Sequence, residues 1–258
     1  MQQGSDMQIF SLPCERAIVT GGGSGLGEAI ARCLASAGAR VVISGRRENV
    51  LREACERLGE RVSYVVHDVT DVSGAERLAK AAAGQNGGAA TILVNNAGVH
   101  LKKPALGESP EECRELLDTH VVGSMALTRA VASGMLEKGR GSIVFVTSMA
   151  ALFGIPEVAA YSAAKSAVLG LVHSLAVEWS GRGVRVNAIA PGWIDSAMSR
   201  QALETDPQRK QRILARTPMG RLGEPDDIGW AAVYLCSEQA KFVTGQQLIV
   251  DGGASIGF

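Results

Sequence analysis

Continuous apolar runs alternate with segments of helical periodicity along most of the chain. Seven strands are predicted from the apolar runs, at 17–19, 41–43, 62–66, 91–94, 142–147, 184–189 and 247–250. Helical patterns lie between them, at 26–37, 48–58, 75–83, 110–137 (with a bend), 158–179 and 225–236. Because the strand runs do not alternate with polar residues, both faces of each strand should be buried. The pattern predicts an α/β fold with a single doubly wound parallel sheet and helices on both faces.

No linker or internal repeat divides the chain. Residues 13–258 are therefore predicted to form one domain, after a flexible polar lead-in over residues 1–12. Residues 193–222 are polar and irregular around a helical middle. Long irregular stretches at the edge of such a sheet often close over ligands, so we expect this segment to be a substrate lid.

Composition and charge exclude several classes of function. The 258 residues carry 26 basic and 26 acidic side chains, so there is no excess of positive charge of the kind that binds nucleic acid. The five cysteines are scattered without a C-x-x-C pair, so we expect neither a metal site nor a disulfide framework. A reducing, cytoplasmic setting follows. The most apolar stretch, 142–160, is broken by Gly154, Pro156 and Glu157, so no membrane span is expected.

Residues with chemical potential stand directly after the predicted strands. They are a glycine cluster after the first strand, Asp68 after the third, Asn95 after the fourth, Ser148 after the fifth and Pro191-Gly192 after the sixth. In a doubly wound sheet, ligands bind at the carboxyl ends of the strands. We therefore expect these residues to meet at one edge of the sheet.

The glycine cluster reads Thr20-Gly21-Gly22-Gly23-Ser24-Gly25-Leu26-Gly27 and lies between the first strand and the first helix. Glycines permit a tight turn and close approach to a pyrophosphate, and the helix start offers free N–H groups to the anion. No lysine follows the glycines, which excludes an ATP-type phosphate loop. The turn therefore predicts a dinucleotide site, with contacts from Gly21, Gly23, Ser24, Gly25, Leu26 and Gly27.

Tyr161 and Lys165 are four residues apart in a helical segment, so they lie on one helix face, one turn apart. A free tyrosine has a pKa near about 10, and a neighbouring lysine cation favours the phenolate. We therefore expect the pKa of Tyr161 to be lowered, which would make the pair an acid/base device.

Together these motifs resemble those of the short-chain dehydrogenase/reductase family, from about residue 17 to residue 253. The shared motifs are Thr20-Gly21-x-x-x-Gly25-Leu26-Gly27, Asn95-Asn96-Ala97-Gly98, Ser148, Tyr161-x-x-x-Lys165 and Pro191-Gly192. The resemblance implies a Rossmann-type fold and an enzyme that transfers hydride reversibly between a nicotinamide cofactor and a carbonyl or secondary alcohol.

The resemblance also implies roles for single residues. Tyr161 would protonate the carbonyl oxygen as hydride arrives, and Ser148 would polarise the carbonyl. Lys165 would lower the pKa of the phenol and bond the nicotinamide ribose. Further cofactor contacts are implied for Asp68 and Val69 at the adenine, for Asn95, Ala97 and Gly98 after the fourth strand, and for Pro191, Gly192, Ile194 and Ser196 at the nicotinamide end.

His120 departs from the family pattern. Family members usually carry an asparagine here, which holds a water that links the lysine to solvent. Our hypothesis is that His120 takes over this relay as a titratable catalytic group. Two alternatives remain: a histidine fixed in the core by hydrogen bonds, and a protein that binds the cofactor with little turnover.

Cofactor choice depends on the end of the second strand, Ile43-Ser44-Gly45-Arg46-Arg47. NAD-preferring members of the family place an acidic residue where Gly45 stands. The guanidinium groups here suit a 2′-phosphate by charge and geometry. We therefore predict NADP(H), with Arg46 as the main contact and Arg47 in support, and NAD(H) as the alternative.

The substrate is less well defined by the sequence. Leu152, Phe153, Ile155 and Trp193 indicate a partly apolar pocket, and three basic residues could meet an anionic or polyhydroxyl substrate, although packing and solvation explain them equally well: His100, Lys102 and Lys103. The chain is similar to 3-oxoacyl-carrier-protein reductases and to gluconate 5-dehydrogenases. A 3-oxoacyl thioester or similar small ketone is expected, and a sugar acid or polyol is the alternative.

Two further expectations concern class and assembly. Ser162-Ala163-Ala164-Lys165 fits the S-x-x-K motif of penicillin-recognising enzymes, but the partner motifs S-D-N and K-T-G are missing from the sequence. The family resemblance implies a homotetramer, built through the two long helices and the C-terminal strand region.

Overall fold

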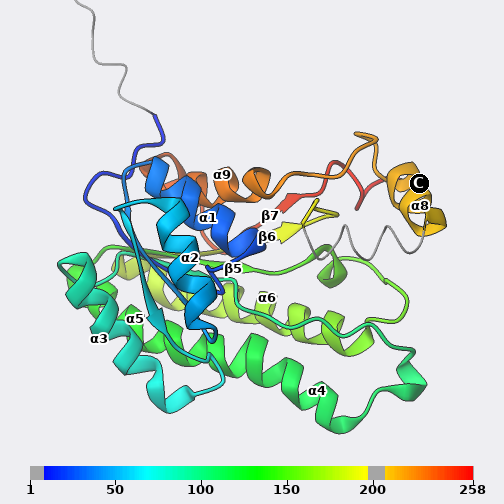
Figure 1. Cartoon of the computed structure of the whole chain (residues 1–258), viewed down its shortest axis with the longest axis horizontal. Coiled ribbons are helices and arrows are strands. Elements are labelled where there is room, and N and C mark those ends of the chain that lie inside the picture. Colours follow the sequence, from blue (N-terminus) through cyan, green and yellow to red (C-terminus); the bar gives the residue numbers. More distant parts are fainter. Residues whose placement is uncertain (1–8, 197–206, 258) are drawn as a thin grey trace, which may run out of the picture.

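The computed structural model describes residues 9–196 and 207–257. Within these residues, seven strands form one parallel sheet in the order β3-β2-β1-β4-β5-β6-β7 (Figure 1). The strands are β1 (Arg16–Thr20), β2 (Arg40–Gly45), β3 (Val62–Val66), β4 (Ile92–Asn95), β5 (Gly141–Val146), β6 (Val184–Pro191) and β7 (Gln247–Val250). The predicted doubly wound parallel sheet is confirmed.

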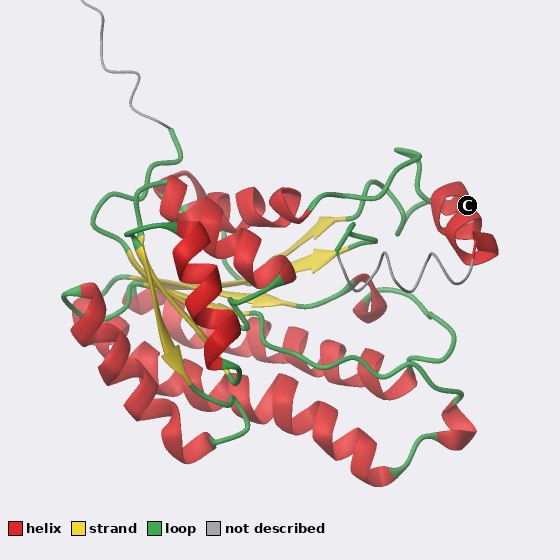
Figure 2. Ribbon diagram, viewed as in Figure 1, coloured by secondary structure: helices red, strands yellow, loops and turns green. Residues whose placement is uncertain are grey.

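Helices cover both faces of this sheet (Figure 2). One face carries α1 (Gly25–Ser36), α2 (Glu48–Leu58) and α9 (Pro225–Cys236), and the other carries α3 (Ala75–Asn86), α4 (Pro110–Leu117), α5 (Ser124–Lys138) and α6 (Ala159–Trp179). The helix α8 (Pro207–Arg216) lies beyond the ends of β6 and β7 (Figure 1). Short helical turns complete the described chain: η1 (Val72–Gly74), η2 (Ala105–Gly107), η3 (Asp118–Gly123), η4 (Met149–Ala151), η5 (Ser180–Arg182) and η6 (Glu238–Ala240).

The strand order reverses between β1 and β4. The chain runs from β1 outward to β2 and β3, then returns to place β4 on the other side of β1. Connections leave the carboxyl ends of β1 and β4 in opposite directions, which opens a crevice between them. This reversal positions the site described below.

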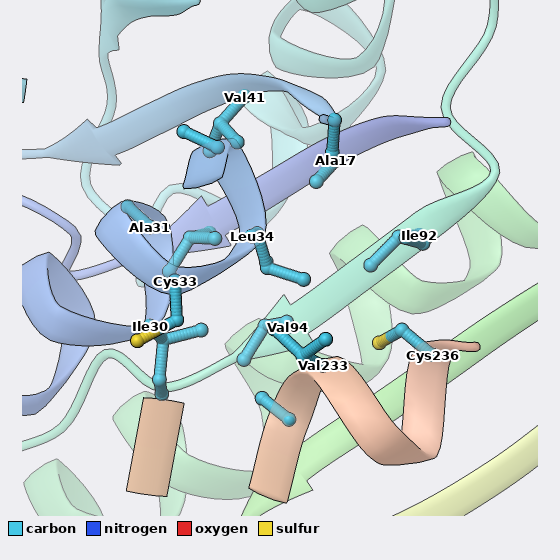
Figure 3. Close-up of a cluster of buried hydrophobic side chains, with 14 of the residues drawn as sticks. Ala17, Ile30, Ala31, Cys33, Leu34, Val41, Ile92, Val94, Val233 and Cys236 are labelled. Atoms are coloured by element: carbon cyan, nitrogen blue, oxygen red, sulfur yellow. The ribbon is translucent and has the colours of Figure 1, made fainter. Parts of the chain in front are cut away.

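The core on one face packs α1 against α9. Figure 3 shows Ile30 and Leu34 of α1 and Val233 of α9 between the helices and the strand residues Val41 and Val94. All five side chains are 1% exposed or less. Burial of this kind contributes roughly 1.5–3 kcal/mol for each large side chain.

The second core lies on the opposite face, so the central strands are covered on both sides. Ile18 and Leu93 point toward α3, α5 and α6, whereas their neighbours Val19 and Val94 belong to the first core. Successive residues of a strand point to opposite faces, so every position of a doubly covered strand is buried.

The predicted helix over 110–137, which was expected to bend, is interrupted at Asp118–Gly123. The π-helical turn η3 separates α4 from α5. A Cβ on Gly123 would lie 2.3 Å from the carbonyl oxygen of Val69, so the glycine lets this turn approach the loop after β3. Such single π turns mark many functional sites, and this one carries His120.

By length and composition alone, one helix in the described part of the chain could cross a membrane, over 159–182. Its Val168, Val172 and Leu175 are buried in the second core. This face of the helix packs against the sheet.

Candidate active site

A cavity of about 1440 Å³ opens at the carboxyl edge of the sheet. Its lining includes residues from the loops that follow six strands, β1 to β6. Of the expected site residues, those that line it are Gly21, Gly23, Ser24, Gly25, Leu26, Gly27, Arg46, Arg47, Asp68, Val69, Ala97, Gly98, His120, Ser148, Tyr161, Lys165, Pro191, Gly192 and Ser196. Asn95 and Ile194 do not belong to this lining.

The glycine turn has the geometry of an anion cradle. Gly21 and Gly25 adopt left-handed φ values of 65° and 58°. A Cβ on Gly27 would lie 2.2 Å from the carbonyl oxygen of Gly21, so only glycine lets α1 begin so close to the turn. Ser24, the residue before α1, makes no side-chain capping bond, which leaves the first N–H groups of the helix available to an anion.

Two residues that sequence reasoning missed, Thr20 and Asn96, fasten this turn to β4. Asn96 Nδ2 donates to the carbonyl oxygens of Thr20 (2.9 Å) and Gly21 (3.3 Å). The backbone N–H groups of Asn96 and Ala97 both donate to Thr20 Oγ1 at 3.0 Å. Both residues lie inside the motifs given above, so the motifs were the sequence signal that could have identified them.

Asn95 itself faces the other way. Its Nδ2 donates to Thr128 Oγ1 of α5 at 2.9 Å. It therefore ties β4 to a helix, and the expected contact of Asn95 with the cofactor stays a prediction. Neighbouring residues at a strand end point to opposite faces, so a register error of one residue exchanges the roles of Asn95 and Asn96.

The loops after β2 and β3 place charged groups along the cavity. Arg46 and Arg47 are exposed and line it. Asp68 Oδ1 accepts from the backbone N–H of Thr70 (3.0 Å) and from Thr70 Oγ1 (2.8 Å). Burial raises the pKa of Asp68, but the bonds from Thr70 and the charge of Arg46 outweigh it and keep the pKa below its usual value. An ionised carboxylate therefore faces this end of the cavity.

Ser148 and Tyr161 meet at the other end. Ser148 follows β5 in extended conformation, and its Oγ accepts from the backbone N–H of Ala150 at 3.1 Å. Tyr161 lies in the first turn of α6. The Ser148 hydroxyl is hydrogen-bonded to the phenol and lowers its pKa, as a donor to the phenol oxygen does. The two hydroxyls can thus address one substrate atom.

The predicted depression of the phenol pKa is wrong in this structure. Burial raises the pKa of Tyr161, and the bond from Ser148 only partly opposes the increase. Lys165 Nζ lies 5.6 Å from the ring centroid and donates to the Val146 carbonyl oxygen at 2.8 Å. Burial lowers the pKa of Lys165 to about 7, so at pH 7 only about half of the side chain is charged, and it favours the phenolate less than a full cation would.

His120 is held in one orientation against Val99, Gly98 and Tyr161. Its Nε2 lies 2.8 Å from the Val99 carbonyl oxygen. A carbonyl can only accept, so Nε2 carries the proton and Nδ1 keeps a lone pair. The ring meets that of Tyr161 edge-on at 5.6 Å between centroids. A Cβ on Gly98 would lie 2.4 Å from His120 Cε1, so the ring fills the space beside this glycine.

Titration of His120 near neutral pH, as our hypothesis required, is also wrong. Burial, reinforced by the charge of Lys165, lowers the pKa of His120 to about 4. The imidazole is therefore neutral at pH 7. Its geometry agrees with the alternative of a histidine fixed by hydrogen bonds.

The residues expected to meet an anionic substrate are engaged with the protein. Lys102 pairs with Glu157 and Lys103 pairs with Glu112, each at 3.0 Å. His100 lines the cavity, and its ring centroid lies 4.8 Å from that of Tyr161. Of the three basic residues, His100 is therefore the one that contacts the Tyr161 ring.

The described part of the expected lid contacts Phe153, in the segment that follows Ser148. The guanidinium of Arg216 in α8 lies 4.3 Å from the centroid of the Phe153 ring, and its Nε donates to the Ala254 carbonyl oxygen at 3.1 Å. Residues 197–206 of the expected lid, and residues 1–8 of the expected lead-in, lie outside the described residues.

Comparisons with known proteins agree with this geometry. The family model described as enoyl-(acyl carrier protein) reductase matches residues 21–255. A galactitol 2-dehydrogenase (L-tagatose-forming) from Cereibacter sphaeroides is 40% identical, and the match covers 96% of this chain and 98% of that protein. A 3-oxoacyl-(acyl-carrier-protein) reductase from Vibrio cholerae is 35% identical, covering 92% and 96%. The chain belongs to the short-chain dehydrogenase/reductase family.

A solved member of the short-chain dehydrogenase/reductase family shows the same fold. The gluconate 5-dehydrogenase from Burkholderia cenocepacia, in complex with NADP and tartrate, has a TM-score of 0.92 at 32% identity, covering 98% of this chain and 99% of its own. The predicted family, Rossmann-type fold and oxidoreductase class are therefore confirmed.

The donor set of this short-chain dehydrogenase/reductase fits a dinucleotide. Gly27 leaves no room for a side chain between helix and turn, and the N–H groups at the start of α1 face the cavity edge as a pyrophosphate requires. Within the described residues, no group of three or more His, Cys, Asp or Glu side chains is arranged to hold a metal ion.

Proposed function

We propose that this enzyme reduces a small ketone to a secondary alcohol with NADPH, and catalyses the reverse reaction, with Tyr161 as the acid/base. The observation that carries this proposal is the hydrogen-bonded pair of Ser148 and Tyr161 at the same cavity as the glycine turn. The cofactor, when bound, supplies the hydride. The protein's own residues bind and orient the reactants and move the proton.

The state of the phenol suits reduction at neutral pH. Because burial raises the pKa of Tyr161, its hydroxyl is protonated and can donate to a carbonyl oxygen as negative charge develops there. The Ser148 hydroxyl, now directed at the phenol oxygen, would direct its proton at the same carbonyl oxygen. Alcohol oxidation needs the phenolate and should be favoured at alkaline pH.

NADP(H) is the cofactor we propose. Gly45 offers no carboxylate to the ribose, and Arg46 and Arg47 line the cavity directly after it. A guanidinium binds phosphate in a forked geometry. The related gluconate 5-dehydrogenase contains NADP, which supports the same choice. The residues that would hold the cofactor are those of the glycine turn with Arg46, Arg47, Asp68, Val69, Ala97, Gly98, Tyr161, Lys165, Pro191, Gly192, Ile194 and Ser196.

Two substrate classes remain candidates. A 3-oxoacyl thioester or similar small ketone is supported by the reductase from Vibrio cholerae. A keto-sugar acid or ketose is supported by the names of the galactitol and gluconate dehydrogenases and by His100, a polar ring next to the phenol. A hydroxylated substrate would find hydrogen-bonding partners there.

A substrate panel tests the proposal. Acetoacetyl thioesters and keto-sugar acids are supplied with NADPH and, in parallel, with NADH. We expect turnover of one class and a higher kcat/KM for NADPH. A clear preference for NADH would contradict the assignment of Arg46, and cofactor binding without turnover on the whole panel would favour a binding protein instead.

We also propose that residues 13–258 form one domain in a cytoplasmic homotetramer, with 193–222 as the lid. One sheet joins all the described strands, and the five cysteines are free. Exposed apolar side chains support assembly through α6 and the C-terminal region: Val177 is 88% exposed and Phe242 is fully exposed. Light scattering would test the tetramer.

A further inference from the structure

The helix that carries Tyr161 begins without a cap of its own. Val158 stands at the N-cap position of α6 and makes no side-chain hydrogen bond to the helix. The first N–H groups of a helix need partners from elsewhere. Because Tyr161 lies in this first turn, fraying here would move the phenol.

The missing partner comes from a segment about fifty residues earlier. Both carboxylate oxygens of Glu108 accept from the backbone N–H of Ala160, at 3.4 and 3.3 Å. Glu108 is half-buried, and its negative charge lies where the helix dipole favours an anion. Ala160 directly precedes Tyr161, so the cap acts one residue from the phenol.

The same segment holds the residue before the helix in an unusual conformation. Glu157 has a φ of 65°, a left-handed value that costs a non-glycine residue about 1–3 kcal/mol and persists only when neighbours hold it. Its carbonyl oxygen accepts from the Lys103 N–H at 2.7 Å, and its carboxylate pairs with Lys102 at 3.0 Å. The turn into α6 is thus fastened on both its backbone and its side chain.

The segment is also fixed at its far end. Lys103 Nζ bonds both carboxylate oxygens of Glu112 at 3.0 Å, and Glu112 forms a capping box with Ser109 at the start of α4. At its near end, His100 packs on the Tyr161 ring. These contacts make one connected unit from the end of β4 to the start of α4.

We propose that residues 100–112 form a brace that sets the position of Tyr161, with Glu108 as the main positioning residue. Glu108 acts through the start of helix α6 and does not line the cavity itself. This inference rests on the proposed role of Tyr161 as the acid/base. Small displacements of a catalytic group lower kcat strongly, whereas cofactor affinity depends on the glycine turn at the other end of the cavity.

The test compares Glu108→Ala with Glu108→Gln and with a control, Glu76→Ala. Glu76 is an exposed carboxylate in the first turn of α3 and is not part of the cavity lining. Turnover is measured with NADPH and either acetoacetyl-CoA or 5-ketogluconate, whichever the wild type reduces faster. Hydrogen–deuterium exchange over residues 158–162 is measured on the same proteins.

For Glu108→Ala we expect kcat to fall about tenfold or more, KM for NADPH to stay within about twofold, and amides 159–161 to exchange faster. Glu108→Gln keeps an acceptor oxygen and should retain most of the kcat, and Glu76→Ala should match the wild type. Wild-type kcat in Glu108→Ala, with or without faster exchange, would overturn the brace. Tyr161→Phe in the same assay separates the two ideas, because full activity there would overturn the proposed function itself.

Discussion

At the residue scale, the packing of His120 against Gly98 can be tested by enlarging the glycine and shortening the histidine. A methyl group on Gly98 would lie 2.4 Å from His120 Cε1. The ring is held in place by the hydrogen bond from its Nε2 to the Val99 carbonyl oxygen. Gly98→Ala should therefore lower the free energy of unfolding by about 1–3 kcal/mol, as overpacking does. In the His120→Asn background the smaller side chain leaves room, so the same glycine substitution should cost less. Urea unfolding of the four proteins measures this coupling, and strictly additive effects would refute it.

Lys165 gives a pH-dependent contribution to stability whose sign follows from its burial. Its pKa is lowered to about 7 in the folded protein, whereas an unfolded lysine keeps about 10.4. Between these values the unfolded chain binds a proton that the folded chain releases. Stability relative to Lys165→Met should therefore rise with pH from about 7 toward 10, by at most about 1.4 kcal/mol per pH unit.

Urea midpoints of the wild type and Lys165→Met at pH 6, 7, 8 and 9 measure this difference. The difference should be flat below the folded pKa and should grow above it. A constant difference over the whole range would show that Lys165 keeps an ordinary pKa in the folded protein.

Residue-scale predictions from the sequence were strongest where a motif fixes chemistry and weakest where burial decides. The pairing of Ser148 with Tyr161 at one cavity was predicted. The raised pKa of Tyr161 and the lowered pKa of His120 were not predicted. The sequence shows that Lys165 lies one turn from Tyr161, but it does not show how deeply these side chains are buried. Desolvation was the larger effect in all three groups.

At the element scale, the turn between β1 and α1 should tolerate no side chain at Gly27. A Cβ there would lie 2.2 Å from the Gly21 carbonyl oxygen and 2.5 Å from Asn96 Nδ2. Gly27→Ala should push the start of α1 away from the turn. NADPH binding should weaken by about tenfold or more, because the helix N–H groups would no longer point at the pyrophosphate.

Fluorescence titration with NADPH measures this loss, and circular dichroism checks that the fold persists. Gly84→Ala is the matched control, since an added Cβ in this part of α3 meets nothing within 4 Å. That control should bind NADPH as the wild type does and gain up to about 1 kcal/mol of stability. NADPH binding by Gly27→Ala at wild-type affinity would contradict the proposed cradle.

The end of α2 was predicted closely, whereas the end of α3 and the break between α4 and α5 were not. Leu58 and Gly59 mark the end of α2 as expected. Helix α3 continues to Asn86, three residues past its predicted end, and stops where Gly87 adopts a left-handed φ of 72°. The π-helical turn at His120 has no sequence rule as clear as these, because it depends on the approach of Gly123 to Val69.

At the scale of the whole molecule, the sheet and the location of its site followed from pattern alone. Continuous apolar runs required two covered faces, and the strand ends carried the motifs to one edge. Contacts such as that of Glu108 with Ala160 could not be predicted, because they join loops about fifty residues apart whose conformations depend on each other. The brace is therefore a property of the folded molecule.

The central claim is that the Tyr161 phenol supplies the proton at a carbonyl beside the bound cofactor. The most direct test is the rate of NADPH oxidation by Tyr161→Phe at saturating concentrations of the best ketone from the panel, with NADPH affinity measured alongside. We predict a kcat lower by about 10²–10⁴-fold, because the proton donor is lost, with NADPH affinity nearly unchanged. A Tyr161→Phe variant that turns over as fast as the wild type would contradict the account.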